Sequence, residues 1–304
     1  STNDIDKVCE INKLIVDYNI DCIHAQPDPE VAFLCLYKSQ LKCNIIHTAN
    51  EQQLFGDKLF CATKWSHELG TRFEVYGFLE VIADMRLWNK LKTANDQIWC
   101  RSAFGAGSKA ALPVKTIDEA KSWVSYWVKN KKIKADDFML SEFLPGKEYA
   151  VQTLWHDGKL LHSQARERVE YFFGNMIPSG QSSTPSVAKT VKDQDVYDMA
   201  NAAINSITGS PNGIYCVDMK RNSLGILIPT EVNYGRFFTT SDFFSSLGMN
   251  SPKLYCKMLQ GYVPIKDDIK INCIEDEYYW LRGLDKLPTL IEGSEYNYFL
   301  RNEK

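Results

Sequence analysis

The chain has 304 residues, of which 44% are hydrophobic, so it holds enough apolar material for one large core or two to three smaller ones. Its formal net charge of -3 and the lack of a long basic run argue against a nucleic-acid partner. No apolar stretch reaches the roughly 20 residues that span a bilayer, and the first residues carry no signal-peptide pattern, so we expect a cytoplasmic protein without a membrane partner.

The first part of the chain alternates helix and strand patterns. Apolar residues recur at helical spacing over 5–18 and again over 31–41, and each segment is followed by a short predicted strand, at 21–24 and 44–47. This order predicts parallel pairing in an α/β layer. Since no strand with a glycine-rich turn comes before the first helix, we expect a partial α/β unit over 1–55, its first strand either cut off or lying on another polypeptide.

Two helices and a strand are predicted next. One helix covers 57–69, and another begins at the capping box Thr116 to Glu119; we assign its two tryptophans to the core rather than to ligand stacking. The strand that starts at Ile98 carries Arg101 and runs into a loop of small residues at 104–109.

The loop at 104–109 is a candidate phosphate-binding segment. Small residues tolerate unusual dihedral angles, so the backbone N–H groups of such a loop can surround phosphate oxygens. Arg101, just before the loop, supplies a forked cation suited to phosphate. The Walker pattern of Gly-x-x-x-x-Gly-Lys followed by Ser or Thr is absent from the sequence.

Two hairpins follow. Residues 149–168 turn at Asp157-Gly158, which favours a type I′ turn, and residues 213–236 form the second hairpin after a helix over 196–207.

The second hairpin places acid and amide side chains inside apolar strands. Alternation puts Asp218 on one face of the first strand, and Glu231 with Asn233 on one face of the return strand. Hard oxygen ligands of this kind suit magnesium, which characteristically bridges substrate phosphates. We therefore predict a magnesium-nucleotide site. The alternative is that the two acids are solvated and face Lys220 and Arg221.

The segment Ser141-Glu142-Phe143-Leu144-Pro145-Gly146-Lys147-Glu148-Tyr149 lies between the loop and this hairpin. With it, the order of parts resembles the ATP-grasp superfamily, in the branch of carbamoyl phosphate synthetase large subunits and carboxylate-amine ligases. The resemblance covers nearly the whole chain. It implies an α/β protein, more narrowly α+β: a partial pre-ATP-grasp unit at 1–55, an ATP-grasp domain at 56–265 with a lid subdomain at about 97–148, and a C-terminal segment at 266–304 that packs on the body. Two α+β subdomains would hold ATP between them.

The resemblance also implies roles for particular residues. Nucleotide-binding residues would be Lys58, Arg101, Gly105, Gly107, Ser108, Lys109, Glu142, Phe143, Leu144 and Glu148. Metal ligands would be Asp218, Glu231 and Asn233, holding two Mg²⁺ ions, with Mn²⁺ as an alternative. Arg236 and Arg101 would act in catalysis, although Tyr234-Gly235-Arg236, counted with the preceding Asn233, has one residue more than the usual Asn-Pro-Arg of the family.

Three cationic side chains on one strand face are candidates for substrate binding. His162, Arg166 and Arg168, together with Arg236, would form an anion pocket for the carboxylate of the substrate, with Phe237 and Phe238 as a wall. The alternative is that the two strand arginines are solvated and pair with Glu167 or Glu170.

The function implied by the resemblance is an ATP-dependent ligase. A carboxylate or bicarbonate would be activated as an acyl phosphate and captured by an amine or ammonia, with release of ADP and phosphate. Two alternatives stay open: an inactive nucleotide-binding regulatory subunit, and a carboxylate kinase. Small-molecule acid and amine substrates are the expected partners, and a homodimer or an ammonia-supplying protein is compatible with the sequence.

Overall fold

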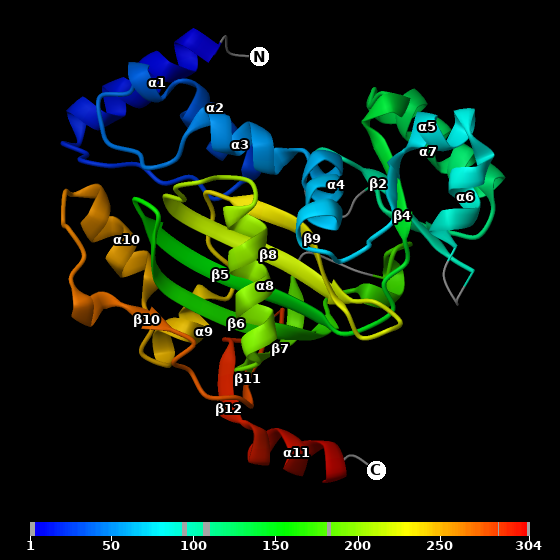
Figure 1. The fold of residues 1–304 in the computed structure, drawn as a ribbon. Helices are drawn as coiled ribbons and strands as arrows, with labels where there is room; N and C mark the ends of the chain where they lie inside the picture. Colours follow the sequence, from blue (N-terminus) through cyan, green and yellow to red (C-terminus); the bar gives the residue numbers. More distant parts are fainter. Residues whose placement is uncertain (1–3, 93–95, 106–109, 181–183, 285, 303–304) are drawn as a thin grey trace.

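The computed structural model describes residues 4–92, 96–105, 110–180, 184–284 and 286–302 (Figure 1). The N-terminal unit consists of α1 (Asp4–Asp17), α2 (Asp28–Leu36), a 3-10 turn (Lys38–Gln40) and α3 (Ala49–Gly56). The predicted helices are confirmed, but the two predicted strands shrink to one parallel bridge between Cys22 and Asn44. A pair of such short strands without a third neighbour is too weak to form a longer ladder.

A small subdomain follows α4 (Lys58–Glu68) and lies at one side of the molecule (Figure 1). Its four strands run antiparallel in the order β1-β4-β2-β3, with bounds β1 (Val75–Gly77), β2 (Ile98–Ser102), β3 (Leu112–Val114) and β4 (Phe138–Glu142). Helices α5 (Phe78–Ala83), α6 (Met85–Leu91) and α7 (Ile117–Lys131) pack on this sheet around a core that includes Val81 and Leu140.

The sheet and core of this subdomain thus begin before the range of about 97–148 that we predict for a lid. The strand β1 and the helices α5 and α6, all before residue 97, belong to the same sheet and core. A strand of three residues is too short to show a periodic pattern, which is why the sequence does not reveal it. The predicted α7 is confirmed, and the Thr116 hydroxyl accepts a hydrogen bond from the Glu119 backbone N–H as its N-cap.

The second sheet has eight strands and forms the body of the molecule. Its order is β12-β11-β7-β6-β5-β8-β9, with β10 parallel to β6 and all other pairs antiparallel. The bounds are β5 (Glu148–His156), β6 (Lys159–Tyr171), β7 (Pro185–Val191), β8 (Gly213–Arg221), β9 (Leu227–Tyr234), β10 (Lys270–Ile271), β11 (Tyr278–Leu281) and β12 (Thr289–Glu292).

Both predicted hairpins are confirmed. In the first, Asp157 and Gly158 have φ values of 45° and 80°, as a type I′ turn requires.

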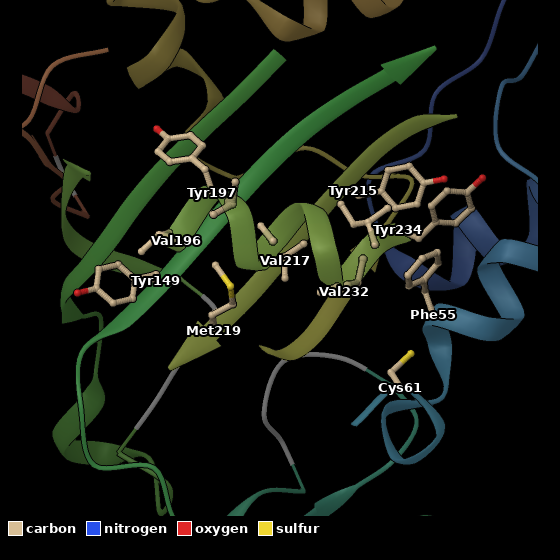
Figure 2. Close-up of a cluster of buried hydrophobic side chains, with 14 of the residues drawn as sticks. Phe55, Cys61, Tyr149, Val196, Tyr197, Tyr215, Val217, Met219, Val232 and Tyr234 are labelled. Carbon is tan, nitrogen blue, oxygen red and sulfur yellow. The ribbon is translucent and has the colours of Figure 1, made fainter. Parts of the chain in front are cut away.

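The two faces of the large sheet bury different side chains. On one face, Tyr215, Val217 and Met219 pack with α3, α4 and α8 (Gln194–Asn205), and Figure 2 shows part of this cluster together with Phe55. On the other face, Ile214 and Cys216 pack against α9 (Ser241–Ser246) and α10 (Ser251–Leu259). The alternation predicted for β8 is thus confirmed, and it points Asp218 to the second face.

The C-terminal segment extends the sheet. The strand β11 pairs with β7, β12 pairs with β11, and α11 (Gly293–Asn302) follows. All nine cysteines carry free thiols. Among the described residues, no helix has the length and apolar character that crossing a membrane requires.

Candidate active site

A cavity of about 500 Å³ lies where the small subdomain, the large sheet and the N-terminal unit meet. Its volume is in the range of small-molecule sites in proteins. The residues that line it include Gln26, Pro27, Lys58, Trp99, Arg101, Gly105, Trp127, Glu142, Phe143, Leu144, Glu148, Arg166, Arg168, Asp218, Lys220, Glu231, Asn233, Arg236, Phe237 and Phe238.

The register of β8 and β9 brings the predicted metal ligands together. Asp218 lies opposite Glu231 and Cys216 lies opposite Asn233, so all the polar side chains share one face. Asn233 Nδ2 donates to Asp218 Oδ2 at 3.2 Å. A register shift after Asp218 leaves Thr230 as the extra residue of a bulge, and bulges of this kind re-aim neighbouring side chains.

Cations surround both carboxylates. Glu231 Oε2 lies 3.3 Å from Arg101 Nη1 and 3.9 Å from Lys58 Nζ. Burial alone would raise the pKa of Glu231, but Lys58 and Arg101 hold it below its ordinary value. Asp218 is 7% exposed, and burial raises its pKa to about 6 against the lowering effect of Arg168.

The alternative that these acids are solvated and face Lys220 and Arg221 is wrong. Arg168 Nη2 donates to Asp218 Oδ1 at 2.7 Å. Lys220 instead approaches Glu148, and Arg221 pairs with Asp193 at 2.8 Å.

The predicted nucleotide-binding segment connects the two sheets. Glu142 ends β4, Phe143 and Leu144 form the connection, and Glu148 begins β5. All four residues line the cavity beside the half-buried indole of Trp99. Burial, with Glu74 adding to the effect, raises the pKa of Glu142 to about 7.

Glu148 is held in its charged form. Burial would raise its pKa, but Arg168 and Lys220 outweigh this effect and keep the pKa below its ordinary value. Arg168 forms an ion pair with Glu148 as well as with Asp218, so one guanidinium links the two ends of the site.

The predicted phosphate loop is described only in part. Arg101 donates to the carbonyl oxygen of Thr230, and Gly105 has φ +85° with its carbonyl oxygen 2.5 Å from Lys58 Nζ. Gly107, Ser108 and Lys109 lie outside the described residues.

The four predicted substrate residues have different surroundings. Arg166, Arg168 and Arg236 line the cavity. His162 is absent from the described lining residues, because its ring lies 2.9 Å from Ser251 Oγ and 3.0 Å from the Asp268 carbonyl oxygen, on the side of α10.

The alternative in which the strand arginines pair with Glu167 or Glu170 is also wrong for Arg168, because the partners of Arg168 are Glu148 and Asp218. Glu167 points to the opposite face of β6, where Lys147 and Lys189 lie within 3.3 and 3.6 Å.

Several residues in or beside the cavity carry no functional signal in the sequence. Arg236 Nε lies 2.9 Å from Asp28 Oδ1, and the guanidinium also donates to Asn233 Oδ1, so the N-terminal unit contributes directly to the site. Trp127, assigned to the core, lines the cavity. No local pattern distinguishes Gln26 or Asp28 from other polar residues before a helix; only the long-range contact reveals them.

The donor set is compatible with magnesium carried by a phosphate ligand. The described part of the chain contains no cluster of three or more His, Cys, Asp or Glu side chains that could hold a metal alone. Two carboxylates and an amide oxygen are hard donors, and Mg²⁺ in such sites completes its shell with waters and phosphate oxygens. Lys58, Arg101 and Arg236 around the acids would meet the negative charge of those phosphates.

The fold is similar to that of several solved enzymes. A biotin carboxylase β-γ-ATP complex from Campylobacter jejuni matches with a TM-score of 0.68 and 12% identity, over 90% of this chain and 61% of that chain. The L-amino acid ligase from Bacillus licheniformis matches with a TM-score of 0.63 and 12% identity, over 92% and 65%. The biotin carboxylase domain of 2-oxoglutarate carboxylase from Hydrogenobacter thermophilus, in complex with MgADP, ADP and bicarbonate, matches with a TM-score of 0.67 and 14% identity, over 90% and 60%.

These structures confirm the predicted fold class: the chain has the α+β ATP-grasp fold. It spans about three fifths of the length of the solved chains it matches. No protein-family model and no curated protein matches the sequence.

Proposed function

We propose that this chain carries the ATP-binding centre of an ATP-dependent ligase. A carboxylate, or bicarbonate, would attack the γ-phosphorus of ATP to form an acyl phosphate and ADP, and an amine or ammonia would then displace phosphate from the acyl carbon. The likeness to biotin carboxylases and an L-amino acid ligase supports this reaction class. The carbamoyl phosphate synthetase-like subtype, a homodimer and an ammonia-supplying partner remain predictions.

The nucleotide would lie across the two sheets. Its base would pack beside Trp99 and against the connection formed by Phe143 and Leu144, where backbone groups can read the purine edge. Glu148, kept ionised by Arg168 and Lys220, would accept hydrogen bonds from the ribose hydroxyls. The small subdomain would act as a lid that closes over ATP and keeps water from the acyl phosphate.

The triphosphate would lie over Asp218, Glu231 and Asn233, which would hold Mg²⁺. The metal would neutralise phosphate charge and align the attacking and leaving oxygens, with a second ion as part of the proposal. Phosphoryl transfer needs positioning and charge stabilisation more than covalent help from the protein. Lys58, Arg101 and Arg236 would stabilise the charge that spreads over the transferred group.

One observation carries this proposal: Asp218 and Glu231 face each other across β8 and β9, and cations from three separate parts of the chain converge on them. Lys58 comes from α4, Arg101 from the small subdomain and Arg168 from β6. An arrangement that gathers cations over buried oxygen donors fits a metal-bound polyphosphate better than it fits a purely structural role.

The test is phosphate release from MgATP across a panel of acids and amines, with the amide product identified by mass spectrometry. Glu231→Gln should lower turnover roughly 100-fold or more, while Glu68→Gln, which alters an exposed helix pair of α4, should leave it unchanged. Retained turnover in Glu231→Gln contradicts the proposed role of this residue.

Product analysis separates the alternatives. A ligase forms the amide when acid and amine are both present, and with acid alone it yields a hydroxamate when hydroxylamine is added. A carboxylate kinase releases the acyl phosphate and forms no amide faster than the uncatalysed reaction. A regulatory subunit binds MgATP and releases no phosphate under any condition.

A further inference from the structure

Arg166 is a buried cation in the cavity wall. It lies in β6 and is 2% exposed. Its guanidinium donates to Thr240 Oγ1 and stacks on the Phe238 ring, with the carbon atom of the guanidinium 4.1 Å from the ring centroid. Among the described residues, Arg166 Nε has no hydrogen-bond partner. Burial, with Arg168 adding to the effect, lowers the pKa of Arg166, while Asp218 acts against this lowering.

The other cations of the cavity differ from Arg166 in one respect. Each has a carboxylate within 4.0 Å, and these cations are Lys58, Arg101, Arg168, Lys220 and Arg236. Within the described ranges, Arg166 is the lining cation that has no such partner. A buried charge without a counterion is unfavourable, so the site is suited to an anion that arrives from outside the chain.

The position of Arg166 relative to Asp218 suits a reacting acid. Both residues are register neighbours of Ala150, from opposite sides: Arg166 on β6 and Asp218 on β8. Two strand spacings place their backbones about 10 Å apart. Both side chains line the cavity on this face of the sheet, so a carboxylate bound by the guanidinium would lie near the proposed metal site.

The wall beside Arg166 is apolar and held in place. Phe237, Phe238 and Pro27 all line the cavity. The side-chain amide of Gln26 fixes the backbone of Phe237, because Gln26 Nε2 donates to the Phe237 carbonyl oxygen at 2.5 Å and Gln26 Oε1 accepts from the Phe237 N–H at 3.2 Å. The Phe237 ring is further braced by His24, with centroids 5.0 Å apart.

We propose that Arg166 binds the carboxylate of the acid substrate, and that this acid carries an apolar substituent that packs against Phe237 and Phe238. The inference rests on the proposed function, since it names the acid that the ATP-dependent step would activate. Arg168 then has a different role: it forms ion pairs with Glu148 and Asp218, holds those two carboxylates in place and does not bind the substrate.

The experiment is isothermal titration of the full chain, preloaded with MgADP, using benzoate and cyclohexanecarboxylate as probes, with acetate and bicarbonate for comparison. We expect the two apolar acids to bind at least about 10-fold more tightly than acetate or bicarbonate, because a buried ring adds apolar contact. Arg166→Gln should weaken benzoate binding about 100-fold. Arg166→Lys should recover part of this loss, and Arg86→Gln, an exposed arginine of α6, should have no effect.

A second readout separates binding from a structural role. If Arg166 is present for the ligand, Arg166→Gln removes an unpaired buried charge, and the Tm of the ligand-free protein should stay the same or rise. Phe238→Leu keeps the charge, removes the ring beneath it and should weaken benzoate binding about 10-fold.

The outcomes are decisive in each case. Benzoate affinity within threefold of the unaltered protein in both Arg166→Gln and Phe238→Leu overturns the inference, as does a lowered Tm of Arg166→Gln with unchanged binding. Equal affinity for acetate or bicarbonate overturns the apolar substituent. If benzoate binds through Arg166 but no acid and amine pair releases phosphate from MgATP, Arg166 is a carboxylate-binding residue, and the ligase proposal fails.

Discussion

Replacing Arg168 by methionine should destabilise the protein in a way that depends on pH. Arg168 forms ion pairs with Glu148 and, at 2.7 Å, with Asp218, and all three side chains are at most 15% exposed. Breaking a buried pair by removing one partner costs about 3–5 kcal/mol, because the other charge stays buried without compensation. Lys220, 3.9 Å from Glu148, still compensates that acid in part, so the main penalty falls on Asp218.

The direction of the pH dependence follows from the pKa of Asp218. Burial raises it to about 6 from 3.8, and Arg168 is the main group that lowers it, so Arg168→Met should raise it further. A carboxyl group with a higher pKa in the folded state than in the unfolded state makes the protein less stable as pH rises through that interval. The loss caused by Arg168→Met should therefore be small at pH 4.5 and complete at pH 8.

Urea unfolding at the two pH values measures this difference. Lys192→Met, which removes an exposed partner of Glu275, serves as the control and should cost at most about 1 kcal/mol at either pH. The double variant Arg168→Met with Asp218→Asn should recover most of the stability at pH 8. A loss below about 1 kcal/mol at pH 8, or an equal loss at both pH values, would contradict this prediction.

Three further predictions concern the small subdomain, the loop after β9 and a helix cap. Burial, with Glu74 adding to the effect, raises the pKa of Glu142 to about 7 from 4.5, so the ionised carboxylate lowers the stability of the folded protein as pH rises. Glu142→Gln should therefore raise the Tm at pH 8 and leave it nearly unchanged at pH 4.5. Gly235 has φ +79°, and an added Cβ would lie 2.6 Å from Val31 Cγ1. Gly235→Ala should therefore lower the free energy of unfolding, measured in urea, by about 2–4 kcal/mol, and adding Val31→Ala should recover only the part that comes from the clash with Val31. Thr116→Ala removes the N-cap of α7 and should cost about 1 kcal/mol, with no change in MgATP affinity measured by titration calorimetry.

Much of the candidate site follows from local sequence patterns. Strand alternation predicts that Asp218 and the Glu231–Asn233 pair each face one side of a hairpin, and the register of β8 and β9 confirms that these sides coincide. The Asp157-Gly158 turn and the Thr116 cap are confirmed for the same reason. In each case the geometry depends on residues that are close in the chain.

The partners of the charged residues depended on the tertiary structure. Alternation correctly places His162, Arg166 and Arg168 on one face, but it does not say what covers each position along that face. α10 and the Asp268 carbonyl group enclose His162, whereas Arg168 meets Glu148 and Asp218 because β5 lies beside β6 and β8 is the next strand beyond β5.

The contact between Arg236 and Asp28 joins residues far apart in sequence, and the small subdomain includes a strand of only three residues. By itself, the amino-acid sequence determined which side chains share a face and which turns join them, because these properties depend on backbone periodicity and local dihedral preferences. Strand order and the docking of the N-terminal unit decided which carboxylates pair with which cations, because those contacts form only when distant segments pack together.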